Sequence, residues 1–291
     1  MDRAKRTALI AIPVALAAGA GLAWAGSSGN LLTGVQSVFT RAVILAFAVQ
    51  WIAFVPAFIF RTEHFYDMVG SLTYISVVAF AVLLVNRTDQ RALLLFAMVT
   101  IWALRLGLFL SHRVRRAGKD DRFTEIKKSF IRFLSAWTLQ GLWVSFTLAA
   151  ALAAITAPTP QPLGLYARIG LAVWVLGFGF EIVADWQKSR FRRLEANRGK
   201  FISSGLWAWS RHANYFGEIV LWVGVLIVAA PVLQGWQWVA LASPVFVTLL
   251  LTKISGIPLL ERRADEKWGG QEDYEAYKKR TSILVPWPPK K

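Results

Sequence analysis

The chain contains no cysteine and only three histidines in 291 residues. The absence of cysteine excludes disulfide bonds, thiol nucleophiles, iron–sulfur clusters and cysteine-bound zinc. The histidines, His64, His112 and His212, are far apart in the sequence, and no HExxH motif is present. A metal site built from histidines is therefore not expected.

Charged residues are also scarce, at 17% of the chain, whereas an ordinary soluble domain has about 25%. Apolar residues make up 56% of the chain and come in long blocks. The 14 Trp and 19 Phe exceed what the surface of a small soluble protein carries. These features leave no room for a large domain outside the membrane. They predict an all-α, polytopic integral membrane protein in which residues 1–291 form a single membrane-embedded domain.

A helix that spans a membrane needs about 20 mostly apolar residues. Eight stretches meet or nearly meet this length: residues 8–26, 42–60, 68–86, 92–111, 131–156, 165–185, 214–231 and 236–257. Pro244 is expected to kink or split the last stretch. The first stretch ends in Ala23-Trp24-Ala25 and also resembles a signal peptide with a cleavage site. We expect eight spans if this helix is retained, which we favour, and seven if it is removed.

The net charge of +16 has a topological explanation. With the N-terminus inside, 26 of the 33 Lys and Arg residues fall in inner segments and four in outer segments. The positive-inside rule then places both termini in the cytoplasm. Basic residues beside apolar spans are typical of contact with membrane lipids, so nucleic acid is not an expected partner.

Ionisable side chains inside apolar spans are informative, because each costs about 2.5–3.5 kcal/mol at the centre of a membrane helix. Glu181, Asp185 and Lys188 share one face at the end of the sixth stretch, and Arg192 continues that face. Pairing between acids and bases along the helix would explain part of this pattern. Two carboxylates in an apolar span exceed what such pairing requires, so we favour a functional site.

The segment 205–218 leads into the seventh stretch. Its polar residues lie on two helical faces, one with Asn214, Glu218 and Trp222, the other with Arg211 and Tyr215. A helix N-terminus beside Arg211 and His212 is suited to bind an anion such as a phosphate group. The tryptophans of the segment could instead be interfacial anchors only.

Polar residues also occur in the first half of the chain. Arg105 lies inside the fourth stretch and needs a partner such as a carboxylate or a ligand phosphate. Glu63, Tyr66 and Asp67 have helical spacing, and a carboxyl group beside a phenol can polarise a carbonyl oxygen. The alternative is a short polar turn in which Asp67 caps the next helix.

Together these residues resemble the 3-oxo-5-alpha-steroid 4-dehydrogenase family, and most of all its bacterial members of uncharacterised function. The resemblance covers about residues 60–289. It is carried by Glu181…Asp185-Trp-Gln187, by Gly205-Leu-Trp…Ser210-Arg211-His212-Ala213-Asn214-Tyr215-Phe216-Gly217-Glu218, by residues 62–73, and by Glu261, Tyr274, Tyr277 and Pro286-Trp287 in the tail. Sterol C14 reductases and isoprenylcysteine carboxyl methyltransferases share a shorter Arg-His-Pro-x-Tyr-x-Gly core.

The resemblance implies a reductase of the bacterial inner membrane with NADPH in a polar cavity that faces the cytoplasm. The implied cofactor-binding residues are Arg105, Arg122, Glu181, Asp185, Arg192, Arg211, His212, Asn214, Tyr215, Glu218 and Trp222. Two positions depart from the family, since Ala213 replaces a proline and Gln50 is followed by Trp51 where steroid reductases carry a Gln-Glu pair. Glu63 with Tyr66 or Tyr74 is our candidate replacement for that pair as the catalytic group.

The sequence therefore predicts an NADPH-dependent oxidoreductase that reduces a polarised C=C bond, as in an enone, of a steroid-like or other lipophilic substrate from the bilayer. One alternative is an S-adenosylmethionine-dependent methyltransferase of a lipid or prenylated substrate. The other is a non-catalytic, lipid-binding membrane protein. The identity of the substrate and the oligomeric state are left open.

Overall fold

A computed structural model of the chain describes residues 3–86, 89–117 and 121–289. Over these residues the chain is helical, and its extended pairing is limited to an isolated bridge between Ser210 and Ser282. Among the described residues, eight helices are long and apolar enough to cross a membrane, as predicted. The protein is thus an all-α, multi-pass membrane protein.

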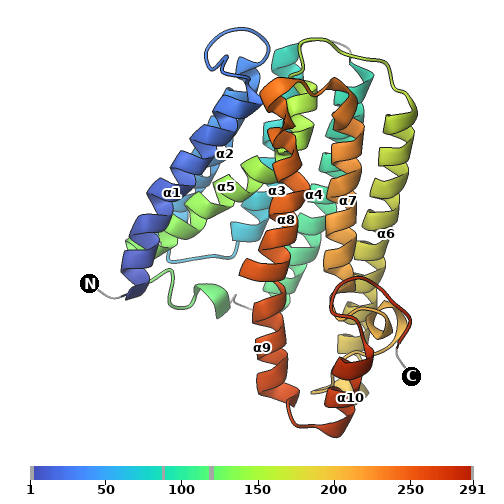
Figure 1. Cartoon of the computed structure of the whole chain (residues 1–291). Helices are drawn as coiled ribbons and strands as arrows, with labels where there is room; N and C mark the ends of the chain where they lie inside the picture. The colour runs from blue at the N-terminus through green and yellow to red at the C-terminus, as the bar shows by residue number, and fades with distance from the viewer. Residues whose placement is uncertain (1–2, 87–88, 118–120, 290–291) are drawn as a thin grey trace. The chain divides into compact units, whose positions relative to one another are not determined.

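The chain divides into two compact units, Met1–Ala167 with Leu226–Ser243, and Arg168–Val225 with Pro244–Lys291. The first unit contains α1 (Arg3–Gly26), α2 (Ser37–Ile59), α3 (Tyr66–Val85), α4 (Gln90–Ala117), η1 (Asp121–Phe123), α5 (Phe130–Ile155), η4 (Ala230–Val232) and η5 (Gly235–Leu241) (Figure 1). The second contains most of α6 (Leu165–Arg193), α7 (Ala213–Ala229) and α8 (Ala242–Leu249), with η2 (Glu195–Asn197), η3 (Gly205–Ala208), η6 (Leu250–Ile254), α9 (Ile257–Trp268) and α10 (Glu272–Arg280).

Helix α5 is the centre of the first unit. It packs against α1, α2, α3 and α4, and also against η4 and η5. Its last two turns, from Leu148 to Ile155, consist of Ala, Leu and Ile residues, all of which are buried. Small side chains allow neighbouring helices to approach a membrane helix closely, so this composition suits a helix that is surrounded by others.

Helices α6 and α7 of the second unit approach each other through glycines. A Cβ atom added at Gly177 would lie 2.4 Å from the backbone nitrogen of Leu221, and one added at Gly217 would lie 2.5 Å from that of Glu181. Gly224 is in a similar contact, 2.6 Å from the backbone nitrogen of Trp174. Close backbone packing through small residues is typical of membrane helix pairs. It brings the acidic face of α6 against the first turns of α7.

Two predicted spans can be compared with the structure in detail. Helix α6 continues to Arg193, beyond the expected end near residue 185. The eighth span is divided, as expected from Pro244: a 3₁₀ segment, η5, precedes α8, and Pro244 lies in the first turn of α8. The N–H groups of the first turn have no hydrogen-bond partner within the helix, so a proline there removes no helical hydrogen bond.

The glycine contact gives a stability prediction with a control on the same helix. Gly177→Ala places a methyl group against the α7 backbone, and we expect it to destabilise the protein by about 1–3 kcal/mol. Gly179 has no atom within 4 Å of an added Cβ, so Gly179→Ala should leave the melting temperature unchanged or slightly raised. Thermal unfolding in detergent measures both. Equal melting temperatures for the two variants would contradict the close packing.

Candidate functional site

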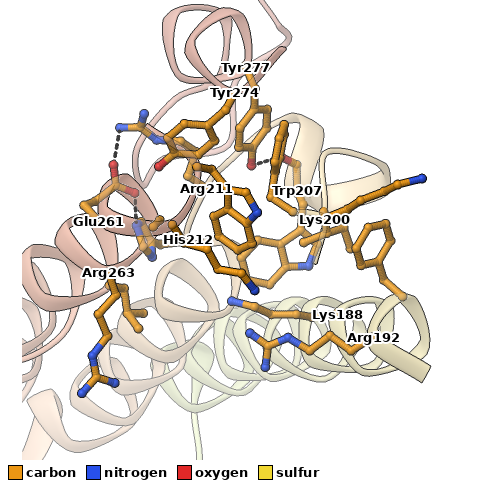
Figure 2. Close-up of a pocket in the computed structure, with 17 residues that line it drawn as sticks. Lys188, Arg192, Lys200, Trp207, Arg211, His212, Glu261, Arg263, Tyr274 and Tyr277 are labelled. Atoms are coloured by element: carbon orange, nitrogen blue, oxygen red, sulfur yellow. Dashed lines mark hydrogen bonds and ion pairs between the residues drawn. The ribbon is translucent and has the colours of Figure 1, made fainter. Parts of the chain in front are cut away.

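The candidate site is a pocket of about 340 Å³ in the second unit (Figure 2). Its wall is formed by the end of α6, the segment 200–202, η3, the two residues before α7, and helices α9 and α10. The basic residues on the wall are Lys188, Arg192, Lys200, Arg211, Arg263 and Lys267. The aromatic ones are Phe191, Phe201, Trp207, Trp268, Tyr274 and Tyr277. Among the described lining residues Glu261 is the one carboxylate.

The charge of this wall determines the class of ligand that it suits. Six basic side chains against one carboxylate create a positive potential that favours an anion with several charges. Arg and Lys are the side chains that bind phosphate groups in proteins. The aromatic rings can hold a planar heterocycle by stacking. The wall therefore fits a phosphorylated ligand that also carries a flat ring.

Glu261 joins the two residues that precede α7. Its Oε2 atom is 3.1 Å from Nη2 of Arg211, and its Oε1 atom is 2.8 Å from Nε2 of His212. A carboxylate in an ion pair can only accept hydrogen bonds, so Nε2 of His212 donates to it. Burial lowers the pKa of His212 below its ordinary value, although the hydrogen bond to Glu261 acts in the opposite direction. The ring is therefore neutral at pH 7.

The tautomer set by Glu261 determines what His212 offers to a ligand. With the proton on Nε2, the Nδ1 atom carries a lone pair, and it has no hydrogen-bond partner among the described residues. His212 is 4% exposed and stacks on Tyr215 with a ring separation of 5.7 Å. His212 thus adds a neutral ring to a wall whose charged side chains are mostly basic.

Gly205 fixes the turn that carries Trp207 into the pocket wall. Its backbone has φ +62, which favours glycine, and an added Cβ would lie 2.6 Å from Oε1 of Gln187. The same Oε1 atom accepts a hydrogen bond of 2.9 Å from the backbone nitrogen of Leu206. The Gly-Leu-Trp motif and the glutamine of Asp-Trp-Gln therefore form one local structure.

Trp207 is buried and held from two sides. Its Nε1 atom donates to the carbonyl of Ala184 on α6 at 3.0 Å. Its own carbonyl accepts a hydrogen bond of 2.7 Å from the hydroxyl of Tyr277 on α10. The ammonium group of Lys188 lies 4.1 Å from the centre of its indole ring, a cation–π contact. Trp207 thus places Lys188 on the pocket wall.

The C-terminal segment after α10 holds Arg211 through the backbone. The backbone nitrogen of Arg211 donates to the carbonyl of Ser282 at 2.9 Å. The hydroxyl of Ser210 donates to the carbonyl of Leu284 at 2.7 Å. These bonds place the C-terminal segment beside the residues that precede α7. This contact explains why both segments belong to one sequence motif.

The structure places the predicted cofactor-binding residues of the second unit in two layers. Arg192, Arg211 and His212 line the pocket. The others lie outside the described lining and pack around the α6–α7 contact: Glu181, Asp185, Asn214, Tyr215, Glu218 and Trp222. In this second layer the side-chain amide of Asn214 donates to Oδ1 of Asp185 at 3.2 Å. Arg211 forms an ion pair with Glu261 at 3.1 Å.

Several pocket residues were not predicted. The sequence places Lys188 on the same α6 face as Glu181 and Asp185 but gives no reason to assign it to the site. Nothing in a run of basic residues distinguishes a lining residue from a solvated one, so the sequence does not single out Lys200, Arg263 or Lys267. Glu261, Tyr274 and Tyr277 were noted in the tail motif, and that motif was the signal that could have placed them in the site.

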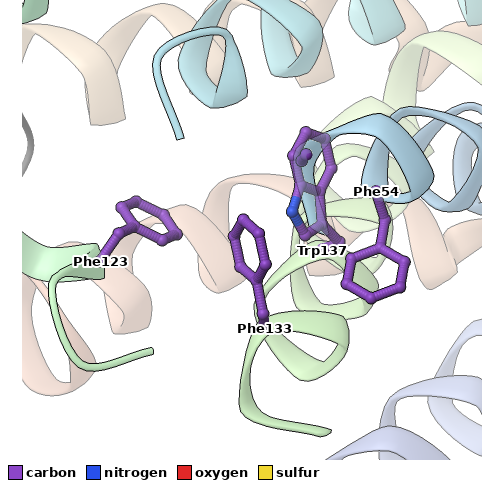
Figure 3. Packing of buried hydrophobic residues seen from close by; sticks show 5 residues of the cluster. Phe54, Phe123, Phe133 and Trp137 are labelled. Carbon is purple, nitrogen blue, oxygen red and sulfur yellow. The ribbon is translucent and has the colours of Figure 1, made fainter. Parts of the chain in front are cut away.

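The predicted catalytic residues belong to the first unit, where an aromatic cluster surrounds the start of α3. The cluster contains Phe54, Ala57, Phe123, Phe133 and Trp137 (Figure 3). The ring of Tyr66 packs on this cluster, 4.6 Å from that of Phe123 and 4.9 Å from that of Trp137. The Tyr66 hydroxyl donates to the carbonyl of Ala136 at 2.9 Å.

Glu63 is 3% exposed and forms an ion pair of 2.6 Å with Lys127. Tyr74 is buried on α3 with its ring edge-on to Trp102. Asp67 is not the cap of α3, since Phe65 occupies that position and Asp67 pairs with Arg122 at 3.2 Å and with Arg113 at 3.6 Å. The guanidinium group of Arg105 lies over the ring of Phe109. These contacts leave the catalytic roles as predictions.

Comparisons with known proteins agree with the resemblance found in the sequence. A family model described as "Protein of unknown function (DUF1295)" matches residues 53–281. The "3-oxo-5-alpha-steroid 4-dehydrogenase 1" of Bos taurus is 28% identical over 118 residues, and that of Rattus norvegicus is 29% identical over 118 residues. Each match covers 40% of this chain and 40% of the relative, so less than half of either curated protein is compared. No solved structure matches the chain.

The protonation state of His212 gives a prediction on stability. Because its pKa is lowered in the folded protein, the unfolded chain binds a proton more readily. The contribution of His212 to stability is therefore complete above its ordinary pKa of 6.5 and is lost as the pH falls toward the folded value. We expect the melting temperature to fall more steeply between about pH 7 and pH 5 in the unsubstituted protein than in His212→Gln. The exposed His112→Gln is the control, and equal slopes for the protein and His212→Gln would contradict the assignment.

Proposed function

The chain belongs to the family described as protein of unknown function DUF1295, and we propose that it is a membrane reductase that uses NADPH to reduce a polarised C=C bond of a lipophilic substrate. The matches to two 3-oxo-5-alpha-steroid 4-dehydrogenases support the reaction class. The eight apolar helices support a substrate that reaches the enzyme from the bilayer. A steroid is one such substrate, and the enone is the chemical group on which the proposal depends.

The observation that carries the proposal is the excess of basic side chains on the pocket wall. NADPH carries a diphosphate and a 2′-phosphate, and it has a flat ring system at each of its two ends. The basic and aromatic residues of the wall match both features. NADPH, when bound, supplies the hydride for the reaction.

In this proposal the chain's own residues have four tasks. Arg192, Lys188 and Arg263 bind phosphate groups, and Glu261 keeps Arg211 and His212 in place through its two short contacts. The hydrogen bond between buried Asp185 and partly buried Asn214 fixes α6 against α7, and so positions the wall without being part of it. Polarising the substrate carbonyl requires a hydrogen-bond donor, and the hydroxyl of Tyr66 or Tyr74 is the candidate, because Glu63 in its ion pair with Lys127 can only accept hydrogen bonds.

The same charge distribution argues against the methyltransferase alternative. S-adenosylmethionine carries a sulfonium, an ammonium and one carboxylate group and has no phosphate, so it is a net cation that a wall with six basic residues would repel. NADPH should therefore raise the melting temperature of the purified protein, whereas S-adenosylmethionine should not, because a ligand stabilises the state that binds it. Stabilisation by S-adenosylmethionine alone would overturn the reductase proposal. A lack of response to both ligands would favour a non-catalytic protein.

Two pairs of neighbouring arginines, on α9 and α6, allow the pocket to be tested as the NADPH site. Arg263 and Arg192 line it, whereas Arg262 and Arg193 are exposed and lie outside the described lining. Loss of one charged contact to a phosphate should weaken NADPH binding by about three- to tenfold in Arg263→Gln and Arg192→Gln. Arg262→Gln and Arg193→Gln should bind as the unsubstituted protein does. An equal loss in all four variants would show a diffuse charge effect and no defined site.

The second layer makes a separate prediction. Asn214→Ala removes the hydrogen bond to the buried Asp185 and leaves that carboxylate with one partner fewer. We expect a lower melting temperature together with weaker NADPH binding, because the wall loses its support. Unchanged affinity for NADPH in Asn214→Ala and in Glu218→Ala would exclude these residues from the cofactor site.

Glu63 can be tested by a change that keeps its size. Glu63→Gln removes the charge that pairs with Lys127, and we expect turnover to fall by about a hundredfold while NADPH still binds. Glu125→Gln is the control, since Glu125 forms an exposed ion pair with Lys128 in the same part of the chain. Single-turnover reduction of an enone measures the effect, and full activity in Glu63→Gln would remove Glu63 from the mechanism.

A further inference from the structure

The segment after α10 has one face that is apolar and uncovered. Ile283, Val285 and Trp287 are 46%, 56% and 68% exposed, whereas the residues between them, Leu284 and Pro286, are partly buried. The exposed and partly buried side chains alternate along the segment, so one set of side chains faces the protein and the other faces outward. The segment is well fixed, because the carbonyls of Ser282 and Leu284 accept hydrogen bonds from Arg211 and Ser210. A fixed, outward row of large apolar side chains indicates a partner.

Helix α7 indicates what that partner is. The backbone nitrogen of Trp287 donates to the carbonyl of Trp209 at 3.1 Å. Trp209 is 47% exposed and lies four residues before Ala213, the first residue of a candidate membrane span. The segment is therefore tied to the level at which α7 enters the apolar layer. Lipid at that level is continuous with the lipid that surrounds α7.

We propose that the outward face of residues 283–287 lies in the interfacial layer of the bilayer, with Trp209 and Trp287 at the level of the headgroups. Indole rings favour this layer because they combine a large apolar surface with one N–H donor. Lys279 and Arg280 are exposed at the end of α10, directly before the segment, and match the charge of anionic headgroups. Because the same segment holds Arg211 through its backbone, membrane contact supports the loop that carries pocket residues.

The absence of cysteine makes a direct experiment possible in the full chain. Single substitutions Ile283→Cys, Leu284→Cys and Val285→Cys are spin-labelled, and the protein is placed in nanodiscs of phosphatidylcholine and phosphatidylglycerol. Ile44→Cys on α2, 61% exposed in a spanning helix, is the control for lipid. Glu272→Cys, exposed at the start of α10, is the control for water. Residues 283–287 can face lipid whether or not NADPH binds. The labels are therefore measured without nucleotide, so that the result does not depend on the proposed function.

We expect labels at 283 and 285 to be relaxed by oxygen more than by a water-soluble nickel complex, as at position 44. The label at 284 should be shielded from both, because this residue faces the protein. Labels at 283 and 285 that behave like the one at position 272 would overturn the proposal in favour of a solvated tail. Shielding from both reagents at 283 and 285, or dipolar broadening between copies, would overturn it in favour of a protein partner. Melting curves that match the unsubstituted protein verify the fold of each variant.

Discussion

The contact of Glu261 with Arg211 and His212 is the interaction on which the pocket depends. It joins α9 to the two residues before α7, with Glu261 oxygens 3.1 Å from Arg211 and 2.8 Å from His212. Without this carboxylate the basic side chains of the wall would repel one another with no internal counter-charge among the described lining residues. The same carboxylate sets the histidine tautomer. One acidic residue therefore controls both the shape of the site and the kind of hydrogen bond it offers.

The membrane fold was predictable because lipid imposes strong rules on sequence. Long apolar blocks such as residues 42–60 and 131–156 have few alternatives to a spanning helix, and the eight helices agree with that prediction. The helix ends were less predictable. Helix α6 continues to Arg193 since polar residues beyond the apolar layer still favour a helix, and hydropathy does not detect such a continuation.

Three of the predicted cofactor-binding residues, Arg192, Arg211 and His212, line the pocket, and their role in binding a cofactor stays a prediction. Arg211 and His212 could be proposed because a basic helix N-terminus has a recognisable sequence pattern, and Arg192 because it continues the face of Glu181 and Asp185. The sequence could not show that Asp185 and Asn214 support the wall from behind. Asp185, for example, shares one face of α6 with Lys188 and Arg192, which line the pocket. Helical spacing therefore does not separate supporting residues from lining residues. The sequence also could not single out Arg263 from Arg262, because only the packing of α9 shows which neighbour faces the pocket.

In the proposed function, several positive side chains together hold the phosphates of a dinucleotide. The dissociation constant of NADPH for the purified protein, measured at low and at high salt, tests this directly. Binding should be measurable at low salt and should weaken steeply as salt is raised, because partly exposed pairs between cations and phosphates are screened. Binding that does not change with salt, or no binding at low salt, would contradict the proposed function.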